Sequence, residues 1–317
     1  MRSAQAIIVS GALAYDDIYL YSGRIKEHLP RDPDAPLYLN LRARGPQQSL
    51  GGCGGNVVYT LSLLKTLVRI HGWVGKDGEQ YLARLRQRGV DVSGVFVASD
   101  VFTSRAVLLA DAAGDQILFF GEPEPPVSLP APDVRPYALA VATAGSPTPS
   151  LEFLAACKAS GVPTVIDPGK LIMDVSPEVL RQAIGGADSL VFNEYEYGLL
   201  LGRLGIPASE LATLASSLVV TRGSEGMRVV SGRGEETIPP VSIAAVADPN
   251  GAGDAFLAGF SFGRYNGFSA AWSARIGAVA ASFALEVPGA QRHTWSREAF
   301  AGRLAATYGE PEKPLPL

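Results

Sequence analysis

The sequence has few cysteines and few charged side chains, and both shortages exclude classes of protein. Cys53 and Cys157 are the only two cysteines in 317 residues, and their separation is wrong for a disulfide framework or a zinc motif. Charged residues make up 18% of the chain, and the formal net charge is -4 at pH 7. The chain therefore has no general electrostatic attraction for nucleic acid or for an anionic membrane.

Long hydrophobic runs are also absent from the sequence. The first apolar run, from Ala4 to Ala14, soon meets Asp16 and Asp17, so it is too short for a signal peptide and typical of a buried strand. No other apolar stretch approaches the roughly 18 residues that a membrane helix needs. Together with the two unpaired cysteines, this pattern predicts a cytoplasmic protein.

Apolar residues are nevertheless abundant, at 47% of the chain, and they fall in an alternating pattern of short strands and helices. We predict buried strands at Ala6–Ser10, Arg69–Val74, Leu139–Ala142, Thr164–Asp167, Ser189–Asn193 and Leu218–Thr221. We predict helices at Val57–Thr66, Tyr81–Arg88, Leu151–Ala159, Pro177–Ile184, Tyr195–Leu201, Asp254–Tyr265 and Ala270–Leu285. Such alternation predicts an α/β fold, with a central and mainly parallel sheet flanked by helices.

Two stretches interrupt this alternation. Residues 12–50 are polar, aromatic and rich in proline, and residues 96–120 read as strands joined by a turn at Ala113–Gly114. Long loops inside a compact domain are uncommon without a function. We predict that the two stretches form a small β lid on a single domain, whose core comprises residues 1–11, 51–95 and 121–317. The alternative is two ordinary surface loops.

The most informative motif is Asp248–Phe260, in which a glycine-rich turn at Gly251, Ala252 and Gly253 leads into an apolar helix beginning near Asp254. Glycines let the backbone come close to a ligand, and the N–H groups of a helix N-terminus favour an anion such as phosphate. A carboxylate beside a bound phosphate has one evident use, which is to accept the proton of an attacking hydroxyl. The alternative is that Asp254 merely caps the helix.

The motif Asp248–Phe260 resembles the C-terminal signature of the PfkB/ribokinase family of carbohydrate kinases, and Leu50–Val57 resembles its N-terminal signature. Smaller matches occur in the family's order at Gly11–Asp16, Val74–Gly78, Gly89–Ser93, Asn193–Glu196 and Thr221–Gly226. The resemblance runs from residue 6 to about residue 308. It implies a ribokinase-like fold and ATP-dependent transfer of a phosphoryl group to an alcohol, with Asp254 as the base and the Gly251–Gly253 amides around the phosphoryl group.

The resemblance also assigns the remaining site residues. Gly51 and Gly52 would approach the acceptor closely, Asn56 would bind its hydroxyls, and Asp16 would accept from two of them, whereas the neighbouring Asp17 is expected to be solvated. The residues that would bind ATP are Asn193, Thr221, Gly223 and Gly226.

A magnesium ion is the metal cofactor that the resemblance implies. Glu196, with Asn193 in the family's Asn-x-x-Glu pattern, and Asp167 would contribute to its binding. The alternative is that Glu196 is a solvated side chain on a first helical turn. Pro249 stands where many family members have Thr, which leaves binding of a monovalent cation such as K⁺ open.

The acceptor is less well defined. The segment from Tyr21 to Pro30 and the pair Asp248–Pro249 look similar to the bacterial adenosine kinase branch, which implies the 5′-hydroxyl of adenosine as acceptor. The segment Phe120–Pro126 follows that branch less closely, and a sugar or sugar phosphate is the alternative acceptor. Aromatic residues available to stack on a base are Tyr19, Tyr38, Phe102 and Phe120, and basic residues available to a sugar phosphate are Arg24, Arg42, Arg44 and Arg105.

Other classes of function fit the sequence less well. An NAD-dependent oxidoreductase needs Gly-x-Gly-x-x-Gly after the first strand, and the third position after Gly52 and Gly54 is Val57. A P-loop kinase needs Gly-Lys-Ser/Thr, which neither Lys76 nor Lys170 provides. A non-catalytic nucleotide-binding relative is not expected to keep Asp254. The partners we predict are therefore ATP and a small acceptor, with a homodimer formed through the lid as a further prediction.

Overall fold

Nine strands form the main sheet of the protein. The structure is a computed structural model, and it describes residues 6–30, 32, 36–121, 123, 129 and 132–317. The strand order is β13-β12-β11-β10-β9-β8-β1-β4-β5, in which the strands from β11 to β5 are parallel and the β12–β13 hairpin is antiparallel. The strands are β1 (Ile7–Ser10), β4 (Val68–Gly75), β5 (Asp91–Ala98), β8 (Leu139–Ala142), β9 (Thr164–Ile166), β10 (Ala187–Asn193), β11 (Ala215–Thr221), β12 (Met227–Ser231) and β13 (Gly234–Ile238).

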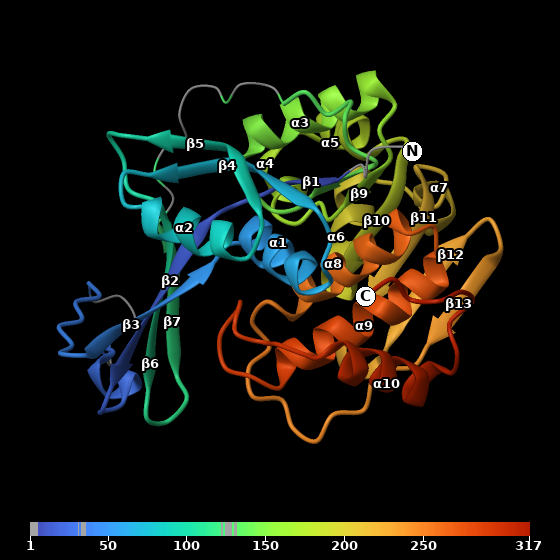
Figure 1. The fold of residues 1–317 in the computed structure, drawn as a ribbon. Coiled ribbons are helices and arrows are strands. Elements are labelled where there is room, and N and C mark those ends of the chain that lie inside the picture. The colour runs from blue at the N-terminus through green and yellow to red at the C-terminus, as the bar shows by residue number, and fades with distance from the viewer. Residues whose placement is uncertain (1–5, 31, 33–35, 122, 124–128, 130–131) are drawn as a thin grey trace.

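Helices cover both faces of this sheet (Figure 1). One face is covered by α1 (Cys53–Leu63), α2 (Glu79–Gln87), α8 (Ala252–Tyr265), α9 (Ala270–Leu285) and α10 (Arg297–Tyr308). The other face is covered by α3 (Pro147–Ser160), α4 (Leu171–Asp174), α5 (Pro177–Ile184), α6 (Glu194–Leu204) and α7 (Ala208–Leu211). The predicted α/β fold with a mainly parallel sheet flanked by helices is confirmed.

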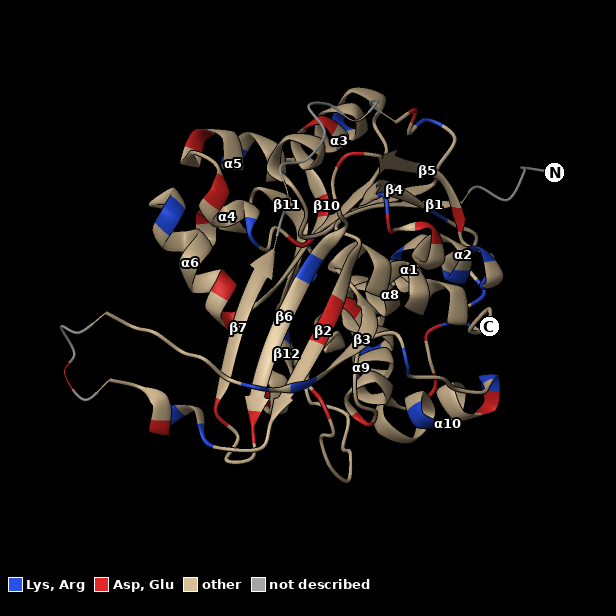
Figure 2. Cartoon of the chain, turned by 90° about the vertical axis from the view of Figure 1, so that its left-hand side faces the viewer, with Lys and Arg blue, Asp and Glu red and all other residues tan. Residues whose placement is uncertain are grey.

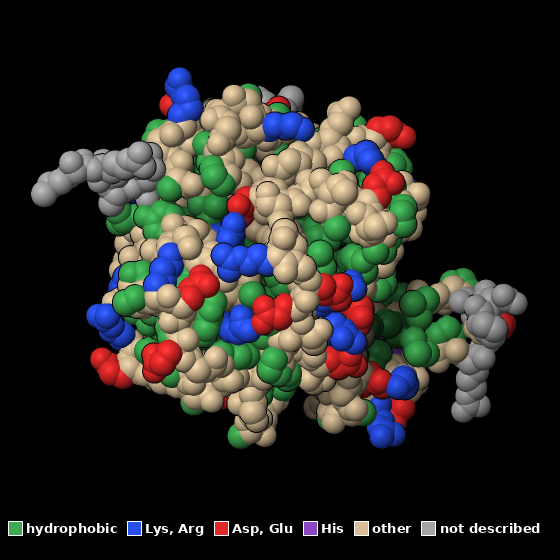
Figure 3. Space-filling view, turned by 90° about the vertical axis from the view of Figure 1, so that its right-hand side faces the viewer, with side chains coloured by type: hydrophobic (Ala, Val, Ile, Leu, Met, Phe, Trp, Pro, Cys, Tyr) green, Lys and Arg blue, Asp and Glu red, His purple; other side chains and the backbone are tan. Residues whose placement is uncertain are grey.

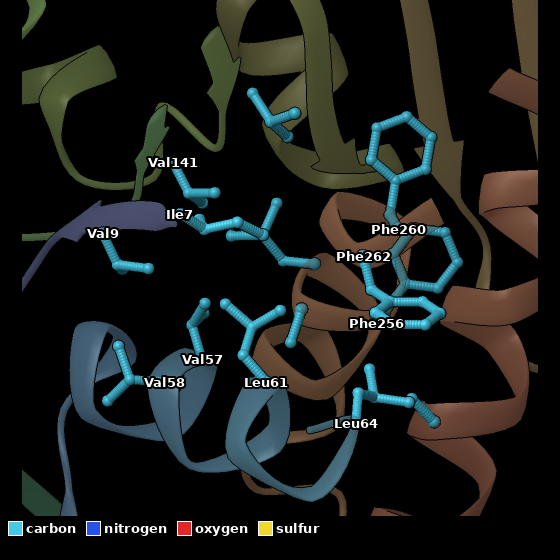
Figure 4. Packing of buried hydrophobic residues seen from close by; sticks show 14 of the residues in the cluster. Ile7, Val9, Val57, Val58, Leu61, Leu64, Val141, Phe256, Phe260 and Phe262 are labelled. Carbon is cyan, nitrogen blue, oxygen red and sulfur yellow. The ribbon is translucent and has the colours of Figure 1, made fainter. Parts of the chain in front are cut away.

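The alternation of side chains along β1 separates two hydrophobic cores. Ile7 and Val9 pack with α1 and α8, and Ile8 between them belongs to the core beneath α3 to α7. Figure 4 shows the first core, where Val57 of α1 points toward β1 and Phe256, Phe260 and Phe262 lie along α8. This packing fixes the positions of α1 and α8, whose N-termini carry the two glycine-rich motifs.

A second sheet of four strands projects from the main body (Figure 1). Its order is β3-β2-β6-β7, with β2 parallel to β6 and antiparallel to β3, and with β6 antiparallel to β7. The strands are β2 (Ala14–Tyr21), β3 (Arg44–Gly51), β6 (Ser104–Asp111) and β7 (Gln116–Gly121). We call these four strands the lid sheet.

The lid sheet lies almost entirely within the two segments predicted to form a lid. One boundary is wrong, because β5 pairs with β4 as far as Ala98, so residues 96–98 belong to the main sheet. Residues 31 and 33–35 of the first segment lie outside the described residues. A closing movement of the lid sheet stays a prediction.

Several other elements differ from the sequence-based prediction: α4 and α7 were not predicted, and α1 and α3 begin at Cys53 and Pro147, before the predicted Val57 and Leu151. The hairpin β12–β13 and the helix α10 were not predicted, and α8 begins at Ala252, two residues before Asp254. Around β12, β13 and α10, side chains of both charges are intermingled (Figure 3), with Arg275 paired to Glu236 and Arg228 near Glu235. Within the described ranges, every helix is too short or too polar to cross a membrane.

Candidate active site

A cavity of about 340 Å³ lies between the lid sheet and the glycine-rich ends of α1 and α8. Figure 2 looks onto the lid sheet, which stands in front of α1 and α8. The lid sheet contributes Asp16, Ile18, Leu108, Leu118 and Phe120, and the main body contributes Gly52, Cys53, Asn56, Gly251 and Asp254. Five of the residues predicted for catalysis and acceptor binding therefore line one cavity, namely Asp16, Gly52, Asn56, Gly251 and Asp254.

The turn before α1 requires glycine for reasons that the structure makes specific. A Cβ atom on Gly51 would lie 2.3 Å from the Asp16 carboxylate. Gly52 has a φ of 80°, and a Cβ atom there would also lie 2.6 Å from the Ala12 carbonyl oxygen. The turn thus brings the backbone against Asp16 on one side and opens the helix N-terminus toward the cavity on the other.

Asn56 and Asp254 are joined directly. Asn56 Nδ2 donates a hydrogen bond of 2.7 Å to Asp254 Oδ2 across the interface between α1 and α8. The sequence predicted Asn56 as a ligand of the acceptor hydroxyls, and the structure shows that one of its contacts is to the predicted base. Asn56 is 8% exposed, so its amide is oriented by protein partners more than by water.

Burial raises the pKa of the Asp254 carboxyl to about 6. Hydrogen bonds from Asn56 and Cys53 oppose the shift, and the negative charges of Asp16 and Glu196 add to it. A carboxylate in these surroundings is ionised at neutral pH yet basic enough to accept a proton, which suits a general base.

Asp16 and Asp17 have opposite surroundings because they point to opposite faces of β2. Asp16 faces the cavity, and burial, with help from the charges of Asp17 and Asp248, raises the pKa of its carboxyl to about 6. Among the described residues, no hydrogen-bond donor reaches the Asp16 carboxylate. The expectation that Asp17 is solvated is wrong: it is 5% exposed, pairs with Arg105 at 2.7 Å and accepts from Gln48 at 2.8 Å.

The turn into α8 is held by Asp248. Its Oδ1 accepts from the Asn250 N–H at 2.9 Å and its Oδ2 from the Gly289 N–H at 2.8 Å. Gly251 has a φ of 76°, which favours glycine, and Gly253 lies exposed at the first turn of α8. The Ala252 N–H donates to the Pro249 carbonyl at 3.3 Å, so this amide already has a partner within the turn.

The residues predicted to bind ATP lie at the carboxyl ends of β10 and β11, outside the lining of the cavity. Asn193 and Thr221 are neighbours across the two strands. Gly223 and Gly226 have φ values of 55° and 84°, and a Cβ atom on Gly226 would lie 2.2 Å from the Ile238 carbonyl oxygen. This edge is where open α/β sheets bind ligands.

Asn193 and Glu196 form a reciprocal capping box at the start of α6. The Glu196 N–H donates to Asn193 Oδ1 at 2.8 Å, and the Asn193 N–H donates to Glu196 Oε2 at 2.9 Å. Glu196 therefore helps to cap α6. Only the carboxylate lone pairs that this hydrogen bond does not use could bind a ligand.

Asp167 is the most perturbed carboxyl among the predicted site residues. Burial, with the charges of Glu196 and Asp254, raises its pKa to about 7, while Thr143 Oγ1 donates to it at 2.9 Å and the Gly169 N–H at 3.1 Å. Three neighbouring carboxylates fit a hard cation chemically. However, no group of three acidic, His or Cys side chains in the described part of the chain is arranged to hold a metal ion by itself.

The far end of the cavity is apolar. Ile18, Leu108 and Leu118 lie side by side on adjacent strands of the lid sheet, and Gln116 lies two residues before Leu118. Of the aromatic residues considered for stacking, Phe120 lines the cavity, whereas Tyr19, Tyr38 and Phe102 do not.

Two cations line the described cavity, and both already have partners. Arg105 is held by Asp17 and Asp77, and Lys170 Nζ lies 4.4 Å from the centre of the Phe120 ring. The other basic residues considered for a sugar phosphate, which were Arg24, Arg42 and Arg44, do not line it.

Sequence reasoning missed several residues at this site, including the aliphatic residues of the lid sheet. Cys53 and Lys170 line the cavity, and Gln291 and Tyr81 contact Asn56 or its neighbouring turn. Cys53 and Lys170 stand inside or next to motifs that were recognised, in Leu50–Val57 and after Asp167. Gln291 and Tyr81 belong to no motif, and no signal in the sequence indicates them.

Comparison with known proteins gives four findings. The family model described as "pfkB family carbohydrate kinase" matches residues 17–297. A nucleoside kinase of Methanocaldococcus jannaschii is 27% identical, and the match covers 78% of this chain and 83% of that protein. The nucleoside kinase of Burkholderia thailandensis in complex with inosine has a TM-score of 0.83 and 26% identity, covering 96% of this chain and 98% of that one. The same kinase with ADP and inosine has a TM-score of 0.80 and 27% identity, covering 97% and 98%.

Proposed function

The chain belongs to the pfkB family of carbohydrate kinases and is a phosphotransferase with an alcohol group as acceptor; we propose that it is an ATP-dependent nucleoside kinase acting on the 5′-hydroxyl. The Burkholderia thailandensis kinase binds inosine and ADP, which supports a nucleoside as acceptor and ATP as donor. Adenosine, which the sequence motifs favour, is our candidate purine nucleoside, and inosine is its nearest rival.

The observation that carries this proposal is the division of the cavity into a polar end and an apolar end. Asp16 supplies two acceptor oxygens at the polar end, and these suit the 2′- and 3′-hydroxyls of a ribose. Ile18, Leu108 and Leu118 form a flat apolar surface at the other end, which suits the face of a base, with the Gln116 amide beside it. A sugar phosphate would instead need an unpaired cation at that end.

The geometry supports a separate role for each of the chain's own residues in this proposal. Asp254 Oδ2 accepts a hydrogen bond from Asn56, and the other oxygen, Oδ1, would accept the proton of the 5′-hydroxyl. The N-terminal amides of α8 at Gly253 and Asp254 would stabilise the charge on the transferring phosphoryl group. Positioning and electrostatics of this kind supply most of the catalysis in phosphoryl transfer.

The nucleotide would lie along the carboxyl ends of β10 and β11, over Asn193, Thr221, Gly223 and Gly226. Asp167 and Glu196 would hold a magnesium ion, which would neutralise negative charge on the phosphates. We leave K⁺ outside the proposal, because Pro249 offers no side-chain oxygen beside the Asp248 turn.

The test is ADP release from ATP with adenosine, inosine, ribose or fructose 6-phosphate as acceptor, with and without Mg²⁺. We expect turnover with the nucleosides at the lowest KM, and none without Mg²⁺. Turnover confined to ribose or to fructose 6-phosphate would refute the nucleoside proposal and leave the phosphotransferase assignment intact. The matched control is Phe119→Ala, on the face of β7 opposite Phe120: it should leave the KM for nucleoside unchanged, and Phe120→Ala should raise it.

We also propose that two copies associate through the lid sheet. Its outer face carries Phe119, which is 56% exposed, beside Ile117, Val107 and Leu109 on adjacent positions of β7 and β6. An exposed apolar sheet face with an open edge strand favours association with another sheet. Light scattering should give a dimer for the native chain and a monomer for Phe119→Asp; a native monomer at micromolar concentration would refute this.

A further inference from the structure

We propose that Gln291 is a positioning residue, which orients the Asn56 amide so that its NH₂ group, and not its oxygen, faces the Asp254 carboxylate. This inference rests on the proposed role of Asp254 as the base. Gln291 lies in the segment after α9, 235 positions along the chain from Asn56. No sequence motif includes it.

The hydrogen bonds around Gln291 have only one consistent direction. Gln291 Nε2 lies 2.9 Å from Asn56 Oδ1 and 2.7 Å from Tyr81 Oη. The Tyr81 hydroxyl has one hydrogen, which it donates to the Gly51 carbonyl at 2.5 Å, so it can only accept from Gln291. An ionised Asp254 can only accept, so Asn56 must donate to it and must turn Oδ1 toward Gln291. Both hydrogens of the Gln291 amide are thereby used.

Steric evidence shows that the fold makes room for this arrangement. Tyr81 is fully buried, and a Cβ atom on Gly55 would lie 1.8 Å from Tyr81 Oη and 3.1 Å from Gln291 Nε2. Glycine is therefore required at Gly55, in the first turn of α1, because any side chain there would clash with Tyr81 and Gln291. The same turn that approaches the acceptor also encloses the residues that orient Asn56.

Backbone strain points the same way. Gln291 has a φ of 57°, a left-handed conformation that residues other than glycine, asparagine and aspartate rarely adopt. Strain of this kind persists where the surrounding structure fixes it, and it gathers at functional sites. Here it places the amide between Asn56 and Tyr81. Glycine and asparagine tolerate this φ better than glutamine does, but neither side chain is long enough to contact both Asn56 and Tyr81.

The consequence is control over which oxygen of Asp254 acts. Because Asn56 Nδ2 uses one acceptor position of Oδ2, we expect the proton of the acceptor hydroxyl to go to Oδ1. If the Asn56 amide turned over, its oxygen would face the carboxylate and Asp254 would lose a stabilising donor. The charged and titratable groups that surround Asp254 are Asp16 on β2, Asp167 after β9, Glu196 on α6, Cys53 on α1 and Tyr81 on α2.

The decisive variant is Gln291→Asn, because asparagine tolerates a positive φ better than glutamine but is one carbon shorter. We expect kcat to fall at least about tenfold, since small misplacements of reacting groups are costly. KM for ATP and for the acceptor should change by less than about twofold, and Tm should fall only slightly, because relief of the positive φ offsets part of the loss of two hydrogen bonds. Gln291→Glu keeps the reach and loses both donors, and it should show the same fall in kcat.

Gln80 provides the matched control. It is exposed and lies on the wall of the small neighbouring cavity that Gln291 also lines, so Gln80→Asn and Gln80→Glu should leave kcat unchanged. In an Asn56→Ala background, Gln291→Asn should cause no further loss, because its effect passes through Asn56. A wild-type kcat in Gln291→Asn, or an equal loss in both backgrounds, would overturn the inference.

A readout without substrate separates this inference from the proposed function. If all four acceptors are rejected, the nucleoside assignment fails, and the Gln291 inference is then decided by hydrogen exchange of the Asn56 side-chain amide. Loss of the Gln291 contact should accelerate that exchange at least about tenfold relative to Gln80→Asn, because the amide is then held by Asp254 alone and can turn over. Equal exchange rates in the two variants would refute the inference.

Discussion

Replacing Asp254 with Asn should have opposite effects on turnover and on stability. The carboxylate is buried among Asp16, Glu196 and Asp167, and its pKa is raised from 3.8 to about 6. A raised pKa means that the folded protein disfavours the charged form that the unfolded chain adopts freely. The stability cost is therefore absent well below pH 3.8, grows as the pH rises and is complete above about pH 6.

The size of that cost follows from the shift. The difference between 3.8 and about 6 corresponds to roughly 3 kcal/mol at neutral pH, at about 1.36 kcal/mol for each pKa unit. Asp254→Asn removes the charge and can keep the hydrogen bond from Asn56, so the variant should be more stable by up to this amount. We expect Tm to rise by about 2 to 6 °C near pH 7. Roughly half of the gain should remain near pH 5, where much of the native carboxyl is protonated.

Turnover should change in the other direction. An amide cannot accept the proton of the acceptor hydroxyl, so kcat should fall by roughly 10² or more. The two measurements are ADP release with adenosine and inosine, and differential scanning fluorimetry at both pH values. Near-normal turnover would remove Asp254 from the mechanism, and a lower Tm would refute the account of its pKa.

Asp17→Asn is the matched control for the loss of a carboxylate charge. Asp17 is 5% exposed, and unlike Asp254 it pairs with Arg105 at 2.7 Å and accepts from Gln48. Removing its charge leaves Arg105 with one partner fewer, so Tm should fall. If both substitutions moved Tm in the same direction, burial of an unpaired carboxylate could not be the reason for the Asp254 effect.

Three further predictions concern residues around the same cavity. The kcat of the native protein should fall as the pH drops through about 6, because protonated Asp254 cannot act as a base; a pH profile flat to pH 5 would contradict this. Asp16→Asn should raise KM for the acceptor about tenfold or more and leave KM for ATP unchanged, since it weakens hydrogen bonds to a charged group, and initial-rate kinetics against each substrate check this. Gly52→Ala should lower Tm more than Gly89→Ala. Both glycines have φ near 80°, but only at Gly52 would the added Cβ lie 2.6 Å from a carbonyl oxygen. Equal losses of Tm would show that backbone strain alone matters.

The sequence predicted the part of the site that depends on local structure. Asp254 and Asn56 each follow a glycine-rich turn at the start of an apolar helix, and both helices pack on the same face of a parallel sheet. Residues near the ends of parallel strands meet at one edge, so the approach of Asp16 to these turns follows from topology. The main sheet was predictable for the same reason, since its strands are short, apolar and separated by amphipathic helices.

The parts that were not predicted depend on contacts between distant segments. The strand at Arg44–Gly51 has no alternation of apolar and polar residues, and it is a strand because β2 pairs with it. The burial of Asp17 depends on Arg105, which β6 brings to it from 88 positions away. Gln291 reaches Asn56 only once α9 and the turn that follows are in place. Local pattern carries no information about any of these contacts.

Three carboxylates that face the site share one property, which is a pKa raised by burial. Burial is the largest cause of the raised pKa of Asp16, Asp167 and Asp254, whereas Asp17, which is also buried but faces away from the cavity, is ion-paired. The carboxylate that faces away from the cavity, Asp17, is thus paired with a cation of the protein itself, Arg105. Three unpaired carboxylates at one edge of the sheet therefore indicate groups whose partners arrive from outside. On the proposed function, hydroxyls would satisfy Asp16 and a metal ion would satisfy Asp167, which leaves Asp254 as the one carboxylate free to accept a proton.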